Sequence, residues 1–205
     1  MFSFKRNLAL ILILALPLIH TAVDAAETGQ GPSEFINYKE ALKKARLTTD
    51  IVVKHYNQAL LNKGGIREAL IECVKTGQEI TSSYSAKTGY IVRRTSLKYR
   101  NPLNMPTPDE KRILKGFNRL NHAGKIKPGY ENHSIVQKGK VKYLLYMRPL
   151  VTKRLCLNCH GGVSDISPDI SRIIKKAYPA DRATGYAIGD IRGAVSIMVP
   201  LEKTH

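Results

Sequence analysis

The sequence HSIVQKGKVKYLLYMRPLV spans residues 133–151 and is typical of a β-hairpin. Two runs rich in Val, Ile, Leu and Tyr flank Lys138-Gly139-Lys140, and glycine supplies the backbone freedom that a tight turn requires. The run TGYIVRRTS at 88–96 predicts another strand, and GAVSIMVPL at 193–201 predicts a further one near the end of the chain. These runs together favour an antiparallel sheet.

Helices are predicted before, between and after the strands. Ser33 is placed to cap a long helix over 35–63 that ends at Gly64-Gly65, and a second helix follows at 66–84. The second helix carries Cys73 on its apolar stripe, so we expect that side chain to point inward. Two shorter helices are predicted, one from Pro108 to about Leu120 with Thr107 and Glu110 as a capping box, and one over 168–178.

No regular alternation of strands and helices is visible, which favours an α+β class. Residues 26–205 are enough for one domain with its own core, and nothing in the composition indicates a second.

The first 25 residues are typical of a secretory signal peptide. Lys5 and Arg6 precede an apolar run over 8–19, and small residues follow, so we expect cleavage after Ala25. That run is well short of the roughly 20 residues that span a bilayer, so we favour a removed signal over a retained anchor. The expected location is the periplasm.

The chain is strongly basic, with 33 Lys and Arg against 16 Asp and Glu, and loss of the signal would leave 31 against 15. Such a charge favours anionic partners, such as an acidic redox or signalling protein. Export makes nucleic acid a poor candidate. We expect membrane association only through an uncleaved signal or the basic surface. The cations are spread among apolar residues, as on an ordinary solvated surface.

Cys156, Cys159 and His160 form the spacing C-x-x-C-H. Covalent haem attachment needs these residue types, because two thiols form thioethers with the vinyl groups and the adjoining imidazole binds the iron. Three alternatives are a zinc site completed by Cys73, a thioredoxin-like redox pair and a plain disulfide. Zinc sites usually use close ligand pairs, and Cys73 has no Cys or His as a near neighbour.

With two thiols used as thioethers, Cys73 has no partner cysteine in this chain. A free cysteine on an apolar stripe is by base rate a small buried hydrophobe, and the rival interpretation is a ligand on the distal face of the iron. The residues alone leave both interpretations open. Other candidates for the distal face are Met105, Met147, His55, His122 and His133.

Three separated stretches carry a resemblance to a known family. They are RRTSLKYRNPLNMPTPDE at 93–110, YMRPLVTKRLCLNCHGG at 146–162 and YPADRATGYAIGDIRGAVSI at 178–197. Together they resemble an exported c-type haem family first described as a domain of unknown function. Its members are free periplasmic or lumenal proteins, or sensory domains of bacterial signalling proteins.

The resemblance implies a PAS-like antiparallel sheet with flanking helices, one long helix at the N-terminal side and one covalent haem c per chain. It also implies a cysteine as the distal iron ligand, and Cys73 stands in that place. Arg94 and Arg100 are candidates to contact the haem propionates, because arginine forks suit carboxylates. Their alternative role is as exposed cations of a turn stabilised by Asn101.

An iron with both axial positions filled has no open site for substrate, so we expect no enzymatic activity. The first hypothesis is a redox or gas sensor in which a change at Cys73 alters the packing of its helix. The second is a small electron carrier that docks through its positive surface on an acidic partner. A haem-free structural module is a third class.

Overall fold

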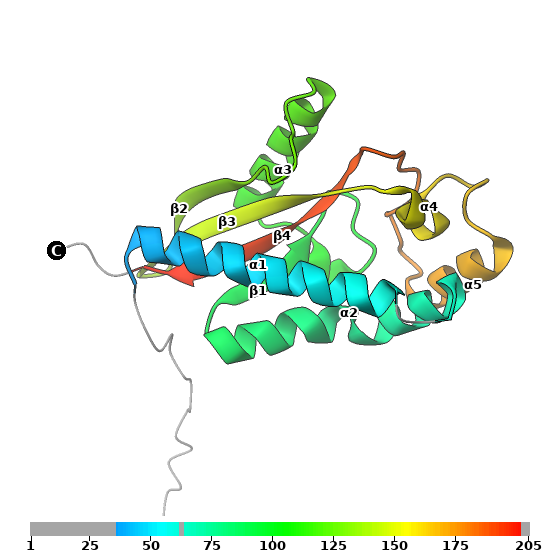
Figure 1. The fold of residues 1–205 in the computed structure, drawn as a ribbon, viewed down its shortest axis with the longest axis horizontal. Coiled ribbons are helices and arrows are strands. Elements are labelled where there is room, and N and C mark those ends of the chain that lie inside the picture. The colour runs from blue at the N-terminus through cyan, green and yellow to red at the C-terminus, as the bar shows by residue number, and fades with distance from the viewer. Residues whose placement is uncertain (1–35, 62–63, 202–205) are drawn as a thin grey trace, which may run out of the picture.

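The computed structural model describes residues 36–61 and 64–201. The expected signal peptide and the expected cap Ser33 lie outside these residues. The fold is α+β, as the sequence predicts, and consists of a four-stranded antiparallel sheet with helices on both faces (Figure 1).

The predicted hairpin is confirmed as β2 (Asn132–Lys138) and β3 (Val141–Val151), joined through Gly139 with φ 60°. The strand predicted at the end of the chain is β4 (Ile191–Pro200), and the earlier one is the short β1 (Ile91–Thr95). The strand order is β1-β4-β3-β2, and all neighbouring strands are antiparallel. The C-terminal strand is therefore central, which explains why it is apolar on both faces.

Strand β3 is buried on both faces at its centre. Leu144 and Tyr146 face the cluster that α1 (Tyr38–Leu61) and α2 (Ile66–Thr88) cover, whereas Leu145 and Met147 face α3 (Pro108–His122). This alternation follows from the two-residue period of a strand. The sheet is thus the middle layer between the α1–α2 pair and α3 (Figure 1).

The two long helices form as expected, although α2 is four residues longer than the predicted segment. It ends at Gly89, whose φ of 69° gives the left-handed cap that glycine adopts easily. The capping box of α3 is also confirmed, with bonds in both directions between Thr107 and Glu110.

Two short helices lie near the end of α2 at which it begins (Figure 1). Helix α4 (Arg154–His160) follows β3 almost directly, and α5 (Pro168–Ala177) packs against α2. A one-turn 3₁₀ helix, Pro102–Asn104, forms the predicted turn after β1. Within the described residues, no helix combines the length and the apolar character that a membrane span requires.

Candidate functional site

The C-x-x-C-H motif forms most of α4. Cys156 lies in its first turn and accepts a hydrogen bond from the Lys153 backbone at 3.4 Å, and His160 is its last residue. Cys156 and Cys159 are three residues apart on this helix, so both thiols lie on one side. Cys159 packs into the apolar cluster between α2 and α5.

His160 is held in one tautomer and one orientation. Its Nδ1 lies 2.8 Å from the carbonyl oxygen of Ala183, and a carbonyl only accepts, so Nδ1 carries the proton. The Nε2 lone pair is therefore free for another partner. Burial, and then the nearby Arg192 and Arg100, lower the pKa of His160 well below its usual value. The imidazole is consequently neutral at pH 7.

The loop at 181–186 runs along the end of α4 and holds the motif in place. Gly185 and Tyr186 donate backbone hydrogen bonds to the carbonyls of Gly161 and His160, at 2.7 and 3.0 Å. The Tyr186 ring meets the His160 ring edge-on at a centroid distance of 6.3 Å. Sequence reasoning assigned no role to the residues of this loop, although it lies in one of the stretches that carry the resemblance.

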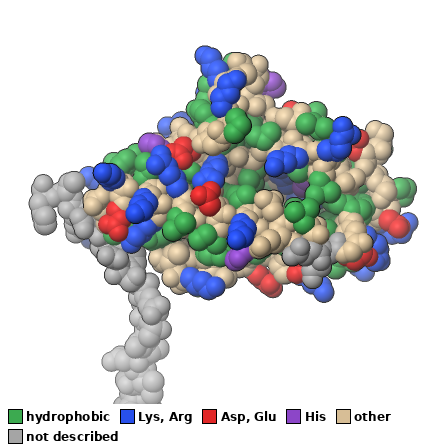
Figure 2. Space-filling model, viewed as in Figure 1, with side chains coloured by type: hydrophobic (Ala, Val, Ile, Leu, Met, Phe, Trp, Pro, Cys, Tyr) green, Lys and Arg blue, Asp and Glu red, His purple; other side chains and the backbone are tan. Residues whose placement is uncertain are grey.

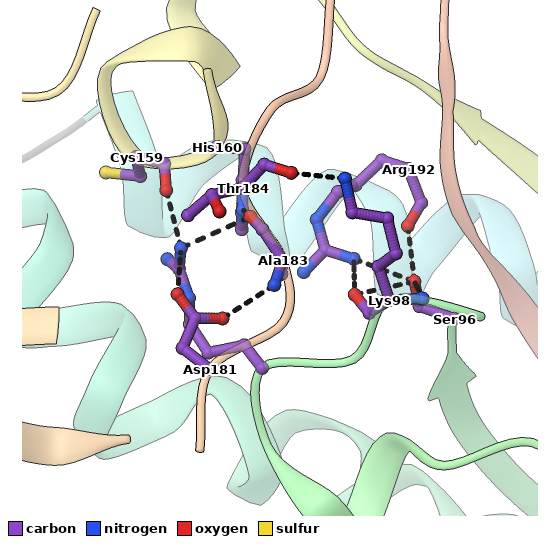
Figure 3. A network of polar contacts seen from close by, with 9 residues as sticks. Ser96, Lys98, Cys159, His160, Asp181, Ala183, Thr184 and Arg192 are labelled. Carbon is purple, nitrogen blue, oxygen red and sulfur yellow. Dashed lines mark hydrogen bonds and ion pairs between the residues drawn. The ribbon is translucent and has the colours of Figure 1, made fainter. Parts of the chain in front are cut away.

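Arg100 is a structural link between this loop and α4. Its Nη2 forms an ion pair with Asp181 at 3.1 Å and donates to the carbonyl of Cys159 at 2.5 Å (Figure 3). The Asp181 carboxylate in turn accepts from the backbone of Ala183. Arg100 is thus buried and paired with protein groups, and its expected contact with a propionate stays a prediction.

A cavity of about 100 Å³, partly open to solvent, lies beside His160. Nine residues line it: Arg94, Thr95, Ser96, Tyr99, Asn104, Leu150, His160, Arg192 and Gly193. They come from β1 and the segment after it, from the ends of β3 and β4 that lie nearest α4, and from α4 itself. The face of the molecule that carries α1 is hollowed on its α4 side (Figure 2).

The Arg94 side chain joins three elements at one point. Its Nη2 donates to the carbonyl of Gly77 on α2 at 3.1 Å, and its guanidinium lies 4.1 Å from the ring centroid of Tyr56 on α1. The Tyr56 hydroxyl donates to the same Gly77 carbonyl. A Cβ at position 77 would come within 2.8 Å of Arg94 Nη2, so this approach needs a glycine.

Cys73 lies one helical turn before Gly77 and is half-buried rather than sealed in the core. Burial raises its pKa, and the positive charges of Arg94 and Arg100 act in the opposite direction. Burial raises the pKa of Cys159 to about 11, and Cys73 lies close enough to contribute to this shift electrostatically. The structure therefore places the three elements that carry Cys73, Cys159 and Arg94 around one region.

The other candidates for a distal ligand lie elsewhere. Met147 is fully buried under α3, and Met105 is largely exposed. His55 contacts the Tyr84 hydroxyl, His133 contacts the Tyr38 hydroxyl, and His122 is exposed at the end of α3. None of these side chains lines the cavity, and neither do the three cysteines. Cys73 differs from the other candidates because it lies close enough to Cys159 to act on it electrostatically.

The zinc alternative lacks a suitable geometry. Within the described ranges, no three side chains of His, Cys, Asp or Glu are arranged to hold a metal ion. Cys73 and the motif therefore do not form a compact Cys₃His set.

For the redox-pair alternative, the position of the motif on its helix is favourable, but the pKa of Cys159 is not. The motif does begin a helix behind a strand, as that alternative requires. Burial raises the pKa of Cys159, however, whereas reactive thiols of this kind have a lowered pKa. All three cysteines are free, so the structure contains none of the disulfides that the plain-disulfide alternative needs.

The model of one protein family matches residues 36–200. The chain belongs to the Tll0287-like family. Among solved structures, it is similar to the cyanobacterial haem protein Tll0287, with 25% identity and a TM-score of 0.62 over 82% of this chain and 99% of that one. No curated protein matches the chain.

Proposed function

We propose that this member of the Tll0287-like family binds one haem c covalently and acts as an exported redox or gas sensor. The observation that carries the proposal is the bond from His160 Nδ1 to the Ala183 carbonyl, which leaves Nε2 free as an iron ligand. A hydrogen bond from the ring nitrogen that does not bind the metal is the usual way in which proteins orient a ligating histidine. The similarity to a cyanobacterial haem protein supports the same choice of cofactor.

The residues around the cavity fit a haem. Cys156 and Cys159 lie three residues apart on a short helix and would form the two thioethers, and His160 follows them directly. Apolar contact is available from Leu150 and Tyr99, and Arg192 has a buried Nε with no partner among the described residues. When bound, the haem iron would supply a one-electron couple and a binding position for small ligands.

Cys73 is proposed as the second axial ligand. Its helix also carries Gly77, whose carbonyl accepts hydrogen bonds from Tyr56 and Arg94. A sulfur ligand that binds or leaves the iron would pull on α2 one turn before this junction. Because the junction includes α1 and β1, a change at Cys73 would reach the long exposed helix that a signalling partner can contact.

The alternative function is electron transfer. The surplus of Lys and Arg suits docking on an acidic redox partner, and the long α1 and α3 helices carry exposed cations (Figure 2). In either function we propose no catalytic turnover, because His160 and Cys73 would occupy both axial positions. The proposed location is the periplasm, where haem attachment to C-x-x-C-H takes place.

The first experiment tests the cofactor. The chain is produced with haem-attachment machinery, and the denatured protein is stained for haem in a gel. We expect a stained band for the wild type and none for the Cys156→Ala, Cys159→Ala double variant. A wild type without stain, or a double variant that keeps it, would refute covalent attachment.

The second experiment tests Cys73. In the wild type we expect an electron paramagnetic spectrum of the low-spin thiolate type, and in Cys73→Ala we expect its loss and a higher reduction potential, because thiolate stabilises ferric iron. Ser83→Ala is a suitable control, since that residue is exposed on the same helix. An unchanged spectrum in Cys73→Ala would return Cys73 to the role of a small buried hydrophobe.

The third experiment separates the two functions. A sensor should reduce slowly and bind carbon monoxide or nitric oxide with loss of the sulfur ligand. A carrier should exchange electrons rapidly, keep its ligands and slow steeply as salt screens its charges.

A further inference from the structure

The cavity beside His160 collects positive charge that the described residues do not balance. Arg94 and Arg192 both line it, and Arg100 lies close enough to act on the same histidine. Asp181 is near enough to act electrostatically on Arg192, but its carboxylate already forms an ion pair with Arg100. Among the described residues, neither Arg94 nor Arg192 forms an ion pair.

Arg192 is held rigidly while part of its guanidinium stays unpaired. Its Nη1 donates to the Ser96 hydroxyl at 3.0 Å and lies 3.4 Å from the carbonyl of Lys98. The Tyr186 ring centroid is 5.4 Å from the guanidinium carbon. Nε is buried without a hydrogen-bond partner among the described residues, and the contacts drawn from the Arg192 guanidinium lead to Ser96 and Lys98 (Figure 3).

Arg94 is in a comparable position on β1. One terminal nitrogen is fixed by the Gly77 carbonyl and the flat face rests on Tyr56, and these contacts involve no negative charge. Burial lowers the pKa of Arg192 to about 10, and the positive charges of Arg100 and then Arg94 act in the same direction. Both guanidinium groups are partly withdrawn from solvent, and cations in such a position gain from an anion beside them.

We infer that Arg94 and Arg192 form a carboxylate-binding pair that takes the two propionates of the haem, one on each guanidinium. The inference rests on the proposed function and deepens it. A haem brings two carboxylates, and the cavity holds two unbalanced guanidinium groups next to the imidazole that would bind the iron. Arg100 has its charge matched by Asp181 and links α4 to the loop at 181–186, so it adds no unbalanced charge to the cavity. Sequence reasoning did not single out Arg192.

The test uses the haem-loaded protein and the variants Arg192→Gln, Arg192→Lys and Arg94→Gln. Arg182→Gln is the matched control, because Arg182 is an exposed arginine of the same loop that stacks on Tyr99. Each variant is first stained for haem in a denaturing gel. Absence of stain in the wild type would refute the proposed function itself, which keeps that failure distinct from the failure of this inference.

Resonance Raman bands of propionate bending are the direct readout. We expect them to shift in all three cavity variants and to stay unchanged in Arg182→Gln, because only the cavity variants lose a bond to a carboxylate. Arg192→Lys keeps the charge but loses the planar fork, so it should shift the band while the protein stays folded. Unshifted bands in haem-loaded Arg192→Lys and Arg94→Gln would overturn the inference.

The reduction equilibrium is the second readout. Removing a cation beside the haem favours the ferric state, so Arg192→Gln and Arg94→Gln should each lower the reduction equilibrium constant by about tenfold, which is about 59 mV for one electron. Arg192→Lys should stay close to the wild type. An equal change in the reduction equilibrium constant of Arg182→Gln would show that overall charge causes the effect, and it would contradict a specific role for Arg94 and Arg192.

Discussion

Gly193 shows how closely two strands approach beside the cavity. A Cβ at this position would collide with the backbone carbonyl of Thr95 on β1 and lie 3.2 Å from the Ser96 Cβ. The neighbouring atoms belong to backbone and to a short side chain, so they have little freedom to move away. Glycine is therefore required by the approach of β1 to β4, not by its backbone angles.

We predict that Gly193→Ala lowers the free energy of unfolding by about 1–3 kcal/mol, the usual cost of forcing extra volume into a packed site. Gly116→Ala is the matched control, because its Cβ on α3 would meet only the far end of Arg119 at 3.9 Å. That control should be neutral or gain about 1 kcal/mol from helix propensity. Denaturant unfolding measures both, and equal effects of the two changes would contradict the steric argument.

The site residues differ in how far sequence could reveal them. Cys156, Cys159 and His160 are adjacent, so their spacing alone indicates shared chemistry. Arg192 is held by Ser96, which is 96 positions away in the chain, and no local pattern indicates that contact. Gly77 is similarly ordinary in sequence, although its carbonyl joins three elements.

At the level of elements, α1 is attached to the sheet by a polar network as well as by its apolar face. Tyr146 is fully buried, and its hydroxyl donates to Glu131 at 2.8 Å and accepts from Arg148 at 3.1 Å. From α1, Arg46 binds Glu131, and Asp50 binds Arg148. Because Tyr146 is buried in this network, its pKa is raised to about 12.

We predict that Glu131→Gln destabilises the protein at neutral pH and much less in acid. The hydrogen bond from Arg46 lowers the pKa of Glu131 below its ordinary value. The carboxylate therefore stabilises the fold above about pH 4.3 and loses that contribution as the pH falls through the lowered pKa. The expected loss at pH 7 is about 1 kcal/mol, because the site is partly solvated.

Denaturant unfolding of both proteins between pH 7 and pH 3 checks this, with Glu79→Gln as an exposed control on α2. If the difference in free energy of unfolding between the wild type and Glu131→Gln stays constant over that pH range, Glu131 acts by packing and not by charge.

Element ends were predictable where side chains make the cap. The box of Thr107 and Glu110 marks α3 in sequence and forms in the structure. The sequence predicts too early an end for α2, because no strong local signal stands between Tyr84 and Gly89 and only the left-handed glycine cap sets that end. Local chemistry thus gives the existence of helices more reliably than their ends.

For the whole molecule, the hairpin and the antiparallel class follow from turn chemistry, but the strand order does not. Strand β4 lies between β1 and β3, and its pairing with β1 joins residues such as Val92 and Ile197 that are far apart in the chain. The same long-range pairing brings the ends of β3 and β4 to the cavity. The site is therefore a product of topology, whereas its thiols and imidazole come from one short segment.

This topology has a consequence for stability, because the cavity encloses cations that the proposed haem would balance. We predict that the haem-loaded chain is more stable than the same chain produced without attachment machinery, by about 1.5–3 kcal/mol, the usual contribution of hydrogen bonds to charged groups, because both arginines are only partly buried. The chain has no tryptophan, so far-ultraviolet circular dichroism in guanidinium is the suitable measurement. Haem-loaded Cys73→Ala is the control that keeps the propionates while losing the proposed sulfur ligand, and it should retain most of the gain. Equal unfolding midpoints with and without haem would mean that water satisfies Arg94 and Arg192. That result would contradict the claim that these two cations need the carboxylates of a haem.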